Sequence, residues 1–558
     1  MKQKRILDTV HGNIYVDEIY FHHLIDTPEF QRLRRIEQTS IRSIFPSARH
    51  DRFIHSIGVY HIGTLFTSQL YNDAVENDWY GITEAKYRQI VESYHIACLL
   101  HDVAHAPFSH TFEEYYGRKT TLKNQLNQSF GEMSPLSKDD LGNESNYHEY
   151  ASAILVLQKF SEKIKELGAD EELVVRMILG CSFTNDNNVL EQIKNCFIEL
   201  LNGGIIDADR LDYACRDVWA SGYSTSSIDV SRLVSGTHIA MNKDGKYHIC
   251  YNINVLNEIK GVLDVKDFQT KYVIHHHTVV YEQYMLVKAA EKMAVEMLAE
   301  GILNDLEKKV RENEEKIAED ILSDEQIEIL KQKKETESTA SALEILSEEQ
   351  RELVNFKIQE DLGTLALEQI ISIKSLTDNK EGPIILKTGD KISYLTDDDL
   401  VYLMKHCKDN NFYKQWASRQ YEMFALWKTP DEFYYHFPEV VSKTISTNLN
   451  DQREKLLKVL RGHGLGSAIV KLENYKPRVG IGKLKILMGE DVIEYSVISN
   501  EKELSPKEAM PFFYIYIPKD YIHNYNNLKI RKIEKAKLIE YIRPTILSMY
   551  TTEKSDAR

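Results

Sequence analysis

The 558-residue sequence has few cysteines, fewer basic than acidic residues, and no long apolar run. Its six cysteines show no CxxC spacing, which indicates reduced, mostly buried thiols of a cytoplasmic protein. The 69 Lys and Arg residues are outnumbered by 85 Asp and Glu, and this net charge of −16 argues against broad binding of nucleic acid. No segment approaches the ~20 apolar residues of a membrane span, and the N-terminus lacks a signal-peptide core. We therefore expect a cytoplasmic protein without a membrane anchor.

The densest group of metal-ligating side chains follows an apolar, helix-forming run that ends near residue 100. His101, Asp102, His105 and His110 lie there within ten residues. Imidazole and carboxylate together suit divalent transition metals. If the helix continues, His101 and His105 share one face of it. Pro107 should then break the helix, so that His110 can point back toward the same place.

Three other stretches supply residues that could complete such a site. They contain His55, His148 and Asp209. Asp209 is followed on one predicted helix face by Asp212, Tyr213 and Arg216, at spacings of three, four and seven residues. Carboxylates at such density need a cation or hydrogen-bond donors when they are buried.

These stretches follow one another in an order that resembles a known family. The motifs that carry the resemblance are Asp26–Arg34 (DTPEFQRLR), Phe45-Pro46, Arg52–Ser56 (RFIHS), His101-Asp102, Pro107–His110 (PFSH) and Asp207–Arg210 (DADR). In this order and near this spacing they resemble the HD-domain metal phosphohydrolases, and most closely the dNTP triphosphohydrolase branch. The resemblance covers roughly residues 1–290 well and the rest loosely.

The resemblance implies an active site with one divalent transition metal (Fe, Mn, Zn or Ni) per chain and Mg²⁺ with the nucleotide phosphates. The implied metal ligands are His55, His101, Asp102 and Asp209. The implied catalytic residues are His110 as general acid, Glu113 to orient it, and His105 and His148 at the α-phosphate. The implied substrate-binding residues are Gln38, Arg52, Arg210, Tyr213, Asp217, Lys271 and Tyr281. The reaction would convert a dNTP and water to a deoxynucleoside and triphosphate, and dNTP depletion against viruses would be one use of it.

Regulation by a second nucleotide is a further implication of the same resemblance. Asp26, Gln31 and Arg34 match residues that contact a guanine nucleotide at a subunit interface in the family. We therefore expect an allosteric nucleotide effector and a homo-oligomer, whether a dimer, tetramer or hexamer. Arg5 departs from the pattern of the animal members, so the effector need not be a guanine nucleotide.

The expected fold is mainly α: an HD-type helical catalytic core with a smaller C-terminal α+β lobe. We expect the phosphohydrolase domain over residues 1–300, a charged helical segment over 301–385, and a helical extension with the α+β domain over 386–558. Residues 26–38 are predicted to form one helix that also carries Gln38. The polar stretch 118–146 is predicted to be an inserted loop beside the active site.

Two other functions remain open from the residues alone. One is an HD phosphodiesterase or nuclease, and the other is a non-hydrolytic nucleotide sensor. The basic set Arg52, Arg210 and Lys271 favours a triphosphate substrate, and a complete metal-ligand set favours an enzyme over a sensor.

Overall fold

The computed structural model is mainly helical, as predicted. It describes residues 2–551 except 131–144, 186, 204, 224–227, 323, 338–339, 379–384, 442, 446–448, 474–480, 490, 499–511 and 524–527. Among these residues no helix combines the length and apolar character needed to cross a bilayer.

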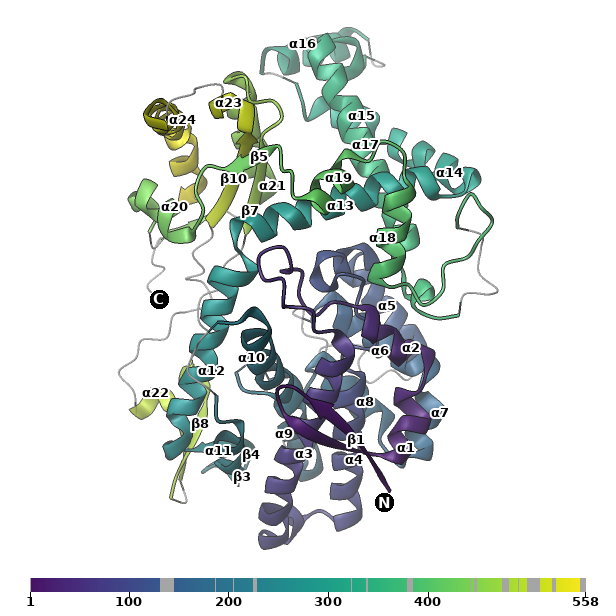
Figure 1. The fold of residues 1–558 in the computed structure, drawn as a ribbon, viewed down its shortest axis with the longest axis vertical. Helices are drawn as coiled ribbons and strands as arrows, with labels where there is room; N and C mark the ends of the chain where they lie inside the picture. The colour runs from purple at the N-terminus through teal and green to yellow at the C-terminus, as the bar shows by residue number, and fades with distance from the viewer. Residues whose placement is uncertain are drawn as a thin grey trace.

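The chain begins with an antiparallel hairpin and continues into the helical core (Figure 1). The hairpin strands are β1 (Gln3–Asp8) and β2 (Gly12–Asp17). The core helices are α3 (Arg52–Glu76), α4 (Glu84–Leu100), α5 (Lys119–Phe130), α6 (Tyr147–Lys159), α7 (Ser161–Glu166), α8 (Glu171–Leu179), α9 (Val189–Asn202), α10 (Ala208–Ser221), α11 (Val230–Ser235) and α12 (Leu256–Phe268).

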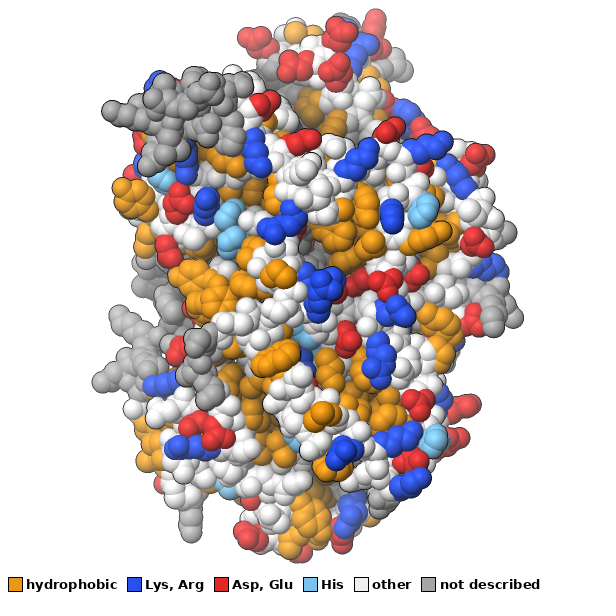
Figure 2. Space-filling view, viewed as in Figure 1, with side chains coloured by type: hydrophobic (Ala, Val, Ile, Leu, Met, Phe, Trp, Pro, Cys, Tyr) orange, Lys and Arg blue, Asp and Glu red, His pale blue; other side chains and the backbone are white. Residues whose placement is uncertain are grey.

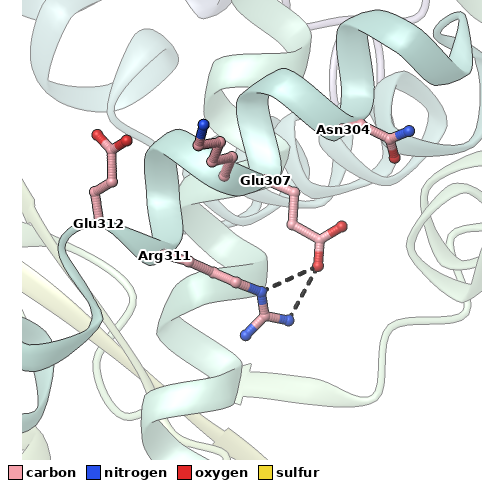
Figure 3. Close-up of a pocket in the computed structure, with 5 residues that line it drawn as sticks. Asn304, Glu307, Arg311 and Glu312 are labelled. Carbon is pink, nitrogen blue, oxygen red and sulfur yellow. Dashed lines mark hydrogen bonds and ion pairs between the residues drawn. The ribbon is translucent and has the colours of Figure 1, made fainter.

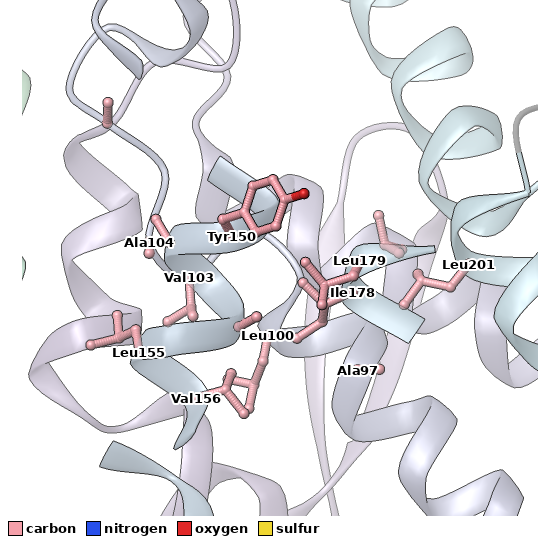
Figure 4. Packing of buried hydrophobic residues seen from close by; sticks show 14 of the residues in the cluster. Ala97, Leu100, Val103, Ala104, Tyr150, Leu155, Val156, Ile178, Leu179 and Leu201 are labelled. Carbon is pink, nitrogen blue, oxygen red and sulfur yellow. The ribbon is translucent and has the colours of Figure 1, made fainter. Parts of the chain in front are cut away.

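Helix α3 lies at the centre of this core, packed between α4 and α10. It is apolar on most of its circumference, as a helix buried on several sides must be. Asp51 caps its N-terminus by accepting a hydrogen bond from Ile54 N at 2.9 Å, and Asp207 caps α10 in the same way at 2.7 Å. Figure 4 shows how small and branched side chains fill the space beside α4, among them Ala97, Leu100 and Val156.

The middle of the chain forms a largely helical arm and the helices that connect it to the C-terminal lobe. These are α13 (His277–Met297), α14 (Glu300–Arg311), α15 (Glu314–Glu319), α16 (Asp324–Thr336), α17 (Glu348–Ile370), α18 (Asp397–His406) and α19 (Asn411–Ser418). Helix α13 packs against both α17 and α19. Three of its residues, Val280, Tyr281 and Met285, also belong to the apolar core of the C-terminal lobe.

The C-terminal lobe combines a three-stranded sheet with helices and lies at the upper left in Figure 1. Its sheet has the order β5 (Met423–Ala425), β10 (Phe512–Pro518), β7 (Ile469–Glu473), with both pairings antiparallel. The helices are α20 (Pro430–His436), α21 (Leu449–Gly462), α23 (Lys519–His523) and α24 (Leu528–Met549), and β6 (Thr444–Ile445) pairs with β11 (Tyr550–Thr551).

Two strands from this late part of the chain leave the lobe. β8 (Lys485–Met488) and β9 (Asp491–Glu494) extend the hairpin of β3 (Thr237–Met241) and β4 (Tyr247–Asn252), in the order β3-β4-β8-β9. β8 runs parallel to β4. The short helix α22 (Tyr495–Ile498) follows β9. Among the described residues, the region 386–558 therefore contributes strands to three sheets.

Three local predictions need correction. The predicted helix 26–38 is only α2 (Pro28–Gln31) followed by a 3₁₀ turn to Arg35, so Gln38 lies beyond it in extended chain. α4 ends at Leu100, so His101 and His105 do not share a helix face. In the predicted loop 118–146, residues 119–130 are helical, while 131–144 lie outside the described residues.

Candidate metal centre and active site

His55, His101 and Asp209 meet where three helices come together. His55 lies in the first turn of α3, His101 directly follows α4, and Asp209 is the second residue of α10. Their candidate ligand atoms all lie within 4.8 Å of one another. Asp209 Oδ1 is 2.9 Å from His55 Nε2 and 3.6 Å from His101 Nε2. Side chains far apart in sequence therefore converge on one point, as a metal site requires.

Asp102, the fourth predicted ligand, borders the same point. Its Oδ2 is 3.7 Å from His55 Nε2 and 3.6 Å from His101 Nε2. Arg52 Nη1 donates a hydrogen bond to this oxygen at 2.7 Å. Burial opposes the carboxylate charge, but Arg52 and the two histidines hold the pKa of Asp102 well below its usual range. The structure thus brings all four predicted ligands together.

The two imidazoles are oriented to present lone pairs to the centre. His55 Nδ1 lies 2.7 Å from Asp212 Oδ2, and His101 Nδ1 lies 3.0 Å from the carbonyl oxygen of Cys98. Because these oxygens accept the Nδ1 protons, each Nε2 faces the centre unprotonated in the neutral ring. Both Nε2 atoms are buried, and among the described residues no donor hydrogen-bonds to them, because their neighbours are the carboxylate oxygens of Asp209 and Asp102. Such orphaned acceptors fit a divalent cation.

The charges around His55 also favour a cation at this centre. Burial disfavours the imidazolium form, yet Asp209 and Asp212 together raise the pKa of His55 to about 9. The carboxylates therefore draw a positive charge into the centre. A divalent cation would compete with that proton for the same place.

A second cluster lies beside this centre and contains His105, His110, Glu113 and His148. Glu113 contacts both outer histidines: Oε2 lies 2.6 Å from His148 Nδ1, and Oε1 lies 3.1 Å from His110 Nδ1. Burial works against a charged His148, but Glu113 raises its pKa to about 9. Burial, together with Arg52 and His148, lowers the pKa of His105 well below its usual value. The cluster therefore pairs a cationic imidazole with a neutral one.

The geometry of this second cluster suits acid–base chemistry and anion binding better than a single ion. The rings of His105 and His148 are stacked, with centroids 4.4 Å apart and planes 16° apart. Because these two rings are nearly parallel, their in-plane lone pairs lie in parallel planes and do not converge on one ion. His110 follows Phe108 and Ser109, which have φ of 53° and 54°, and this left-handed turn reverses the chain after Pro107.

Gln38 and Arg52 lie together between the two clusters. Arg52 donates through Nη2 to the Gln38 carbonyl at 3.1 Å and through Nε to Ser109 Oγ at 3.0 Å. The side-chain Oε1 of Gln38 is buried without a hydrogen-bond partner among the described residues. Its contact with a substrate sugar stays a prediction.

Three predicted substrate residues lie on α10, the helix that carries Asp209. Arg210 donates through Nη1 to the carbonyl of Ile205 at 2.6 Å and through Nε to the Tyr213 hydroxyl at 3.1 Å. Burial raises the pKa of Tyr213 to about 12. Asp217 Oδ1 lies 2.7 Å from His50 Nε2. Their roles at phosphate and sugar stay predictions.

Lys271 and Tyr281 lie toward the C-terminal lobe. Lys271 Nζ contacts Asp431 Oδ1 of α20 at 3.0 Å. The Tyr281 ring packs against Tyr516 in the core of the lobe, with centroids 5.1 Å apart. Tyr281 and His110 nevertheless line the same cavity of about 810 Å³. This cavity connects the exposed histidine to the lobe.

The predicted effector residues Asp26, Gln31 and Arg34 lie near the hairpin. Arg34 Nε donates to Gln31 Oε1 at 2.8 Å, and its guanidinium lies 3.4 Å from the centroid of the Phe53 ring. Asp26 Oδ2 is 3.7 Å from Lys4 Nζ. Asp26 and Arg34 are exposed. Nucleotide binding at this place stays a prediction.

None of four residues behind the centre was predicted as a catalytic, substrate-binding or metal-ligating residue, although the sequence indicates Arg216 as a donor for the carboxylates on its helix face. The four are Asp8 and His11 of the hairpin and Asp212 and Arg216 of α10. Asp212 and Arg216 stood out by their spacing on the helix face. Asp8 and His11 gave only a weak signal, as polar residues between two extended segments. Nothing in the sequence indicates which distant group they face.

A hollow of about 450 Å³ on α14 is separate from both clusters (Figure 3). Arg311 donates through Nε and Nη2 to Glu307 Oε1, one turn away, at 3.2 and 3.0 Å. These charges pair within one exposed helix. The hollow is therefore a solvated charged surface, as expected of the segment 301–385.

Comparison with known proteins agrees with this arrangement. Residues 52–198 match the family model described as HD domain. The chain is 28% identical over 276 residues to a protein of Dictyostelium discoideum named deoxynucleoside triphosphate triphosphohydrolase SAMHD1 homolog, covering 49% of this chain and 45% of that protein. It is 29% identical over 294 residues to the chicken (Gallus gallus) deoxynucleoside triphosphate triphosphohydrolase SAMHD1, covering 51% and 44%. The resemblance predicted from the motifs is thereby confirmed.

Two further matches have no stated activity. An uncharacterized protein of Mycoplasma genitalium is 30% identical over 267 residues, covering 47% of this chain and 54% of that protein. A solved structure of a hypothetical protein from Aquifex aeolicus aligns with 95% of this chain and 99% of its own at 19% identity, with a TM-score of 0.44. The chain spans about half the length of the relatives it matches.

Proposed function

We propose that this chain, which contains an HD domain and resembles the HD-domain dNTP triphosphohydrolases, hydrolyses a dNTP to the deoxynucleoside and triphosphate. The observation that supports this most directly is the adjacency of the two clusters. Arg52 lies between them, in contact with Asp102 on one side and Ser109, the neighbour of His110, on the other. A phosphate bound there would meet a metal on one side and imidazoles on the other.

His55, His101, Asp102 and Asp209 would hold one divalent transition metal. Two orphaned Nε2 atoms and two carboxylates form a donor set that suits Fe, Mn, Zn or Ni. When bound, the cation supplies a Lewis acid for a phosphate oxygen and makes water a better nucleophile. The chain's own part is to keep the Nε2 lone pairs directed inward, through hydrogen bonds at each Nδ1.

His110 would act as the general acid. Hydrolysis at the α-phosphorus forms a bond to a water oxygen and breaks the bond to the 5′-oxygen, which then needs a proton. The His110 side chain is 63% exposed, and its Nδ1 is bonded to Glu113, so Nε2 can donate the proton. Glu113 would orient the ring through this hydrogen bond.

The remaining basic groups would neutralise the phosphates, whose outer members also carry Mg²⁺. His148 is cationic at neutral pH because of Glu113, and Arg52 is fixed by three contacts. Arg210 and Lys271 would contact the outer phosphates. The nucleoside would lie against Gln38, Tyr213, Asp217 and Tyr281, with the cavity shared by His110 and Tyr281 open to it.

The test is product analysis with the purified full-length protein. Each dNTP, alone and in mixtures, is incubated with the protein, and the products are separated by chromatography. The expected products are the deoxynucleoside and intact triphosphate, and about one metal ion per chain should be present by elemental analysis. His101→Ala and Asp209→Ala should lose both metal and turnover. Full metal content in the variant that carries both His101→Ala and Asp209→Ala would contradict the proposal. Release of pyrophosphate, or of no product at all, by the wild-type protein would also contradict it.

A further inference from the structure

A buried network behind the metal centre has no part in the chemistry above. Asp212 of α10 is its hub. Asp212 Oδ2 lies 2.7 Å from His55 Nδ1. Arg216 donates to both carboxylate oxygens at 2.8 Å, through Nε to Oδ2 and through Nη2 to Oδ1. Asp212 is 0% exposed, so a carboxylate that water cannot solvate depends wholly on these partners.

The N-terminal hairpin completes this network, although it lies far from α10 in the sequence. His11 Nε2 lies 2.6 Å from Asp212 Oδ1, and Asp8 accepts two hydrogen bonds from Arg216 at 2.9 and 3.0 Å. These contacts join positions 201 and 208 residues apart. The hairpin therefore contributes directly to the surroundings of a predicted metal ligand.

Gly58 makes room for the hub. It lies on α3, three residues after His55, with its Cα facing the carboxylate. A Cβ built at this glycine would lie 1.9 Å from Asp212 Oδ1 and 2.5 Å from Arg216 Nη2. Both distances are far below a van der Waals contact, so any side chain here would displace Asp212 from His55. A residue without a Cβ is what allows the two helices to share this hydrogen bond.

We propose that Asp212 is a positioning residue for the metal ligand His55, and that His11 and Gly58 determine where Asp212 lies. By accepting the Nδ1 proton, Asp212 selects the tautomer whose Nε2 lone pair faces Asp209. A carboxylate partner also makes the ligating nitrogen more basic, which strengthens its bond to a metal. The inference rests on the proposed function only in requiring a metal at this centre, and it assumes nothing about the substrate.

A neighbouring histidine offers a matched control. His11 and His61 both line a cavity of about 690 Å³, and their ring centroids are 5.4 Å apart. Of these two histidines, however, only His11 hydrogen-bonds to Asp212 among the described contacts. Replacing His61 therefore changes the same cavity without removing a hydrogen bond from the hub.

The experiment measures metal binding directly. The full chain is stripped with a chelator and titrated with Co²⁺, whose visible absorption reports both affinity and coordination. Asp212→Asn should weaken Co²⁺ binding about 10–100-fold, and His11→Ala and Gly58→Ala should weaken it about 10-fold. His61→Ala should stay within about twofold of wild type. Circular dichroism and thermal unfolding of each apo-protein check that the variant folds. His11→Ala changes the hairpin turn and no core helix, so it is the variant least expected to disturb folding.

The outcomes separate this inference from the proposed function. Wild-type Co²⁺ affinity and spectrum in folded His11→Ala and Gly58→Ala would overturn it, and so would a wild-type chain that binds no Co²⁺. The expected order of affinities in a protein that hydrolyses no dNTP would support the positioning role and refute the proposed reaction. If wild type and all variants bind Co²⁺ with equal affinity while the protein hydrolyses dNTPs, the proposed reaction is supported and the positioning role is refuted.

Discussion

At the scale of single residues, His110 can be separated from the metal centre. We predict that His110→Ala lowers kcat about 10²–10⁴-fold, because the leaving 5′-oxygen loses its proton donor. Metal content should stay at the wild-type level, since His110 contacts Glu113 and not the four predicted ligands. Steady-state kinetics and elemental analysis test this. His406→Ala, an exposed histidine on α18, is the control. Near-normal turnover in His110→Ala would assign the proton to another group, such as His105.

His95 gives a pH dependence of stability that is independent of catalysis. It is half-buried on α4, its Nε2 lies 2.9 Å from Thr67 Oγ1, and desolvation lowers its pKa to about 4. In the unfolded chain the pKa is about 6.5. The unfolded state therefore takes up a proton first as the pH falls. The contribution of His95 to stability is complete above about pH 6.5 and decreases toward pH 4, by on the order of 3 kcal/mol in total.

Urea unfolding of wild type and His95→Gln at several pH values tests this prediction. Between pH 7 and pH 5 the free energy of unfolding should fall less steeply in His95→Gln than in wild type. His22→Gln, which changes an exposed histidine, should keep the wild-type slope. Parallel slopes for wild type and His95→Gln would show that His95 does not titrate as its burial indicates.

At the scale of elements, the N-terminus of α18 holds two separate segments of the active site in place. Asp397 Oδ1 accepts a hydrogen bond from Phe108 N at 2.6 Å, and Oδ2 accepts one from Glu37 N at 2.8 Å. Phe108 begins the turn to His110, and Glu37 precedes Gln38. Acidic residues such as Asp397–Asp399 also stabilise a helix N-terminus through the helix dipole. The structure shows that Asp397 also connects α18 to both segments.

We predict that Asp397→Ala destabilises the protein by about 2–4 kcal/mol, because two buried backbone N–H groups lose their acceptor. It should also lower kcat, since the turn that carries His110 loses a support. Asp398→Ala is the matched control: its side chain is 69% exposed and pairs with Arg35, so its effect should stay below about 1 kcal/mol. Chemical unfolding and kinetics measure both variants. Equal stability of the two would show that the buried contacts carry no net stabilisation.

At the scale of the whole molecule, the net charge of −16 is carried by side chains that do not gather in one place on the face shown in Figure 2. On the face shown in Figure 2, acidic and basic side chains are interspersed with apolar patches. This pattern offers no continuous basic surface for nucleic acid on that face. The basic groups proposed to contact a nucleotide are local, as Arg52 between the clusters illustrates.

We further propose that a second nucleotide regulates the molecule through Asp26, Gln31 and Arg34 and favours an active oligomer. Asp26→Ala or Arg34→Ala should remove stimulation of one dNTP's hydrolysis by another while leaving metal content unchanged, because neither residue contacts the centre. Turnover of single and paired dNTPs, with oligomer mass measured in parallel, tests this. Glu166→Ala, which changes an exposed acidic residue that pairs with His23, is the control. Rates independent of every added nucleotide in a fixed assembly would remove the regulation and leave the active-site proposal intact.

The sequence by itself determined the chemistry of the centre. His101 and Asp102 are adjacent, and the other donors lie in short motifs, so their types and order could be read without coordinates. The apolar, helix-forming run that ends near residue 100 likewise predicted the helix α4 (Glu84–Leu100). The strand preference of Ile14–Val16 also agrees with β2, but the turn lies before Gly12 and not at Gly12-Asn13 as local preferences suggest.

Only the tertiary structure decided which distant residues surround that chemistry. The path of the chain brings Asp8 and His11 onto α10, pairs Lys271 with Asp431, and adds β8 and β9 to the sheet of β3 and β4. It also places Gln38 beyond a helix that local preferences extended too far. Short-range preferences act over a few residues, whereas these contacts depend on how whole helices pack. A hydrogen bond between residues 201 positions apart therefore leaves no periodic trace in the sequence.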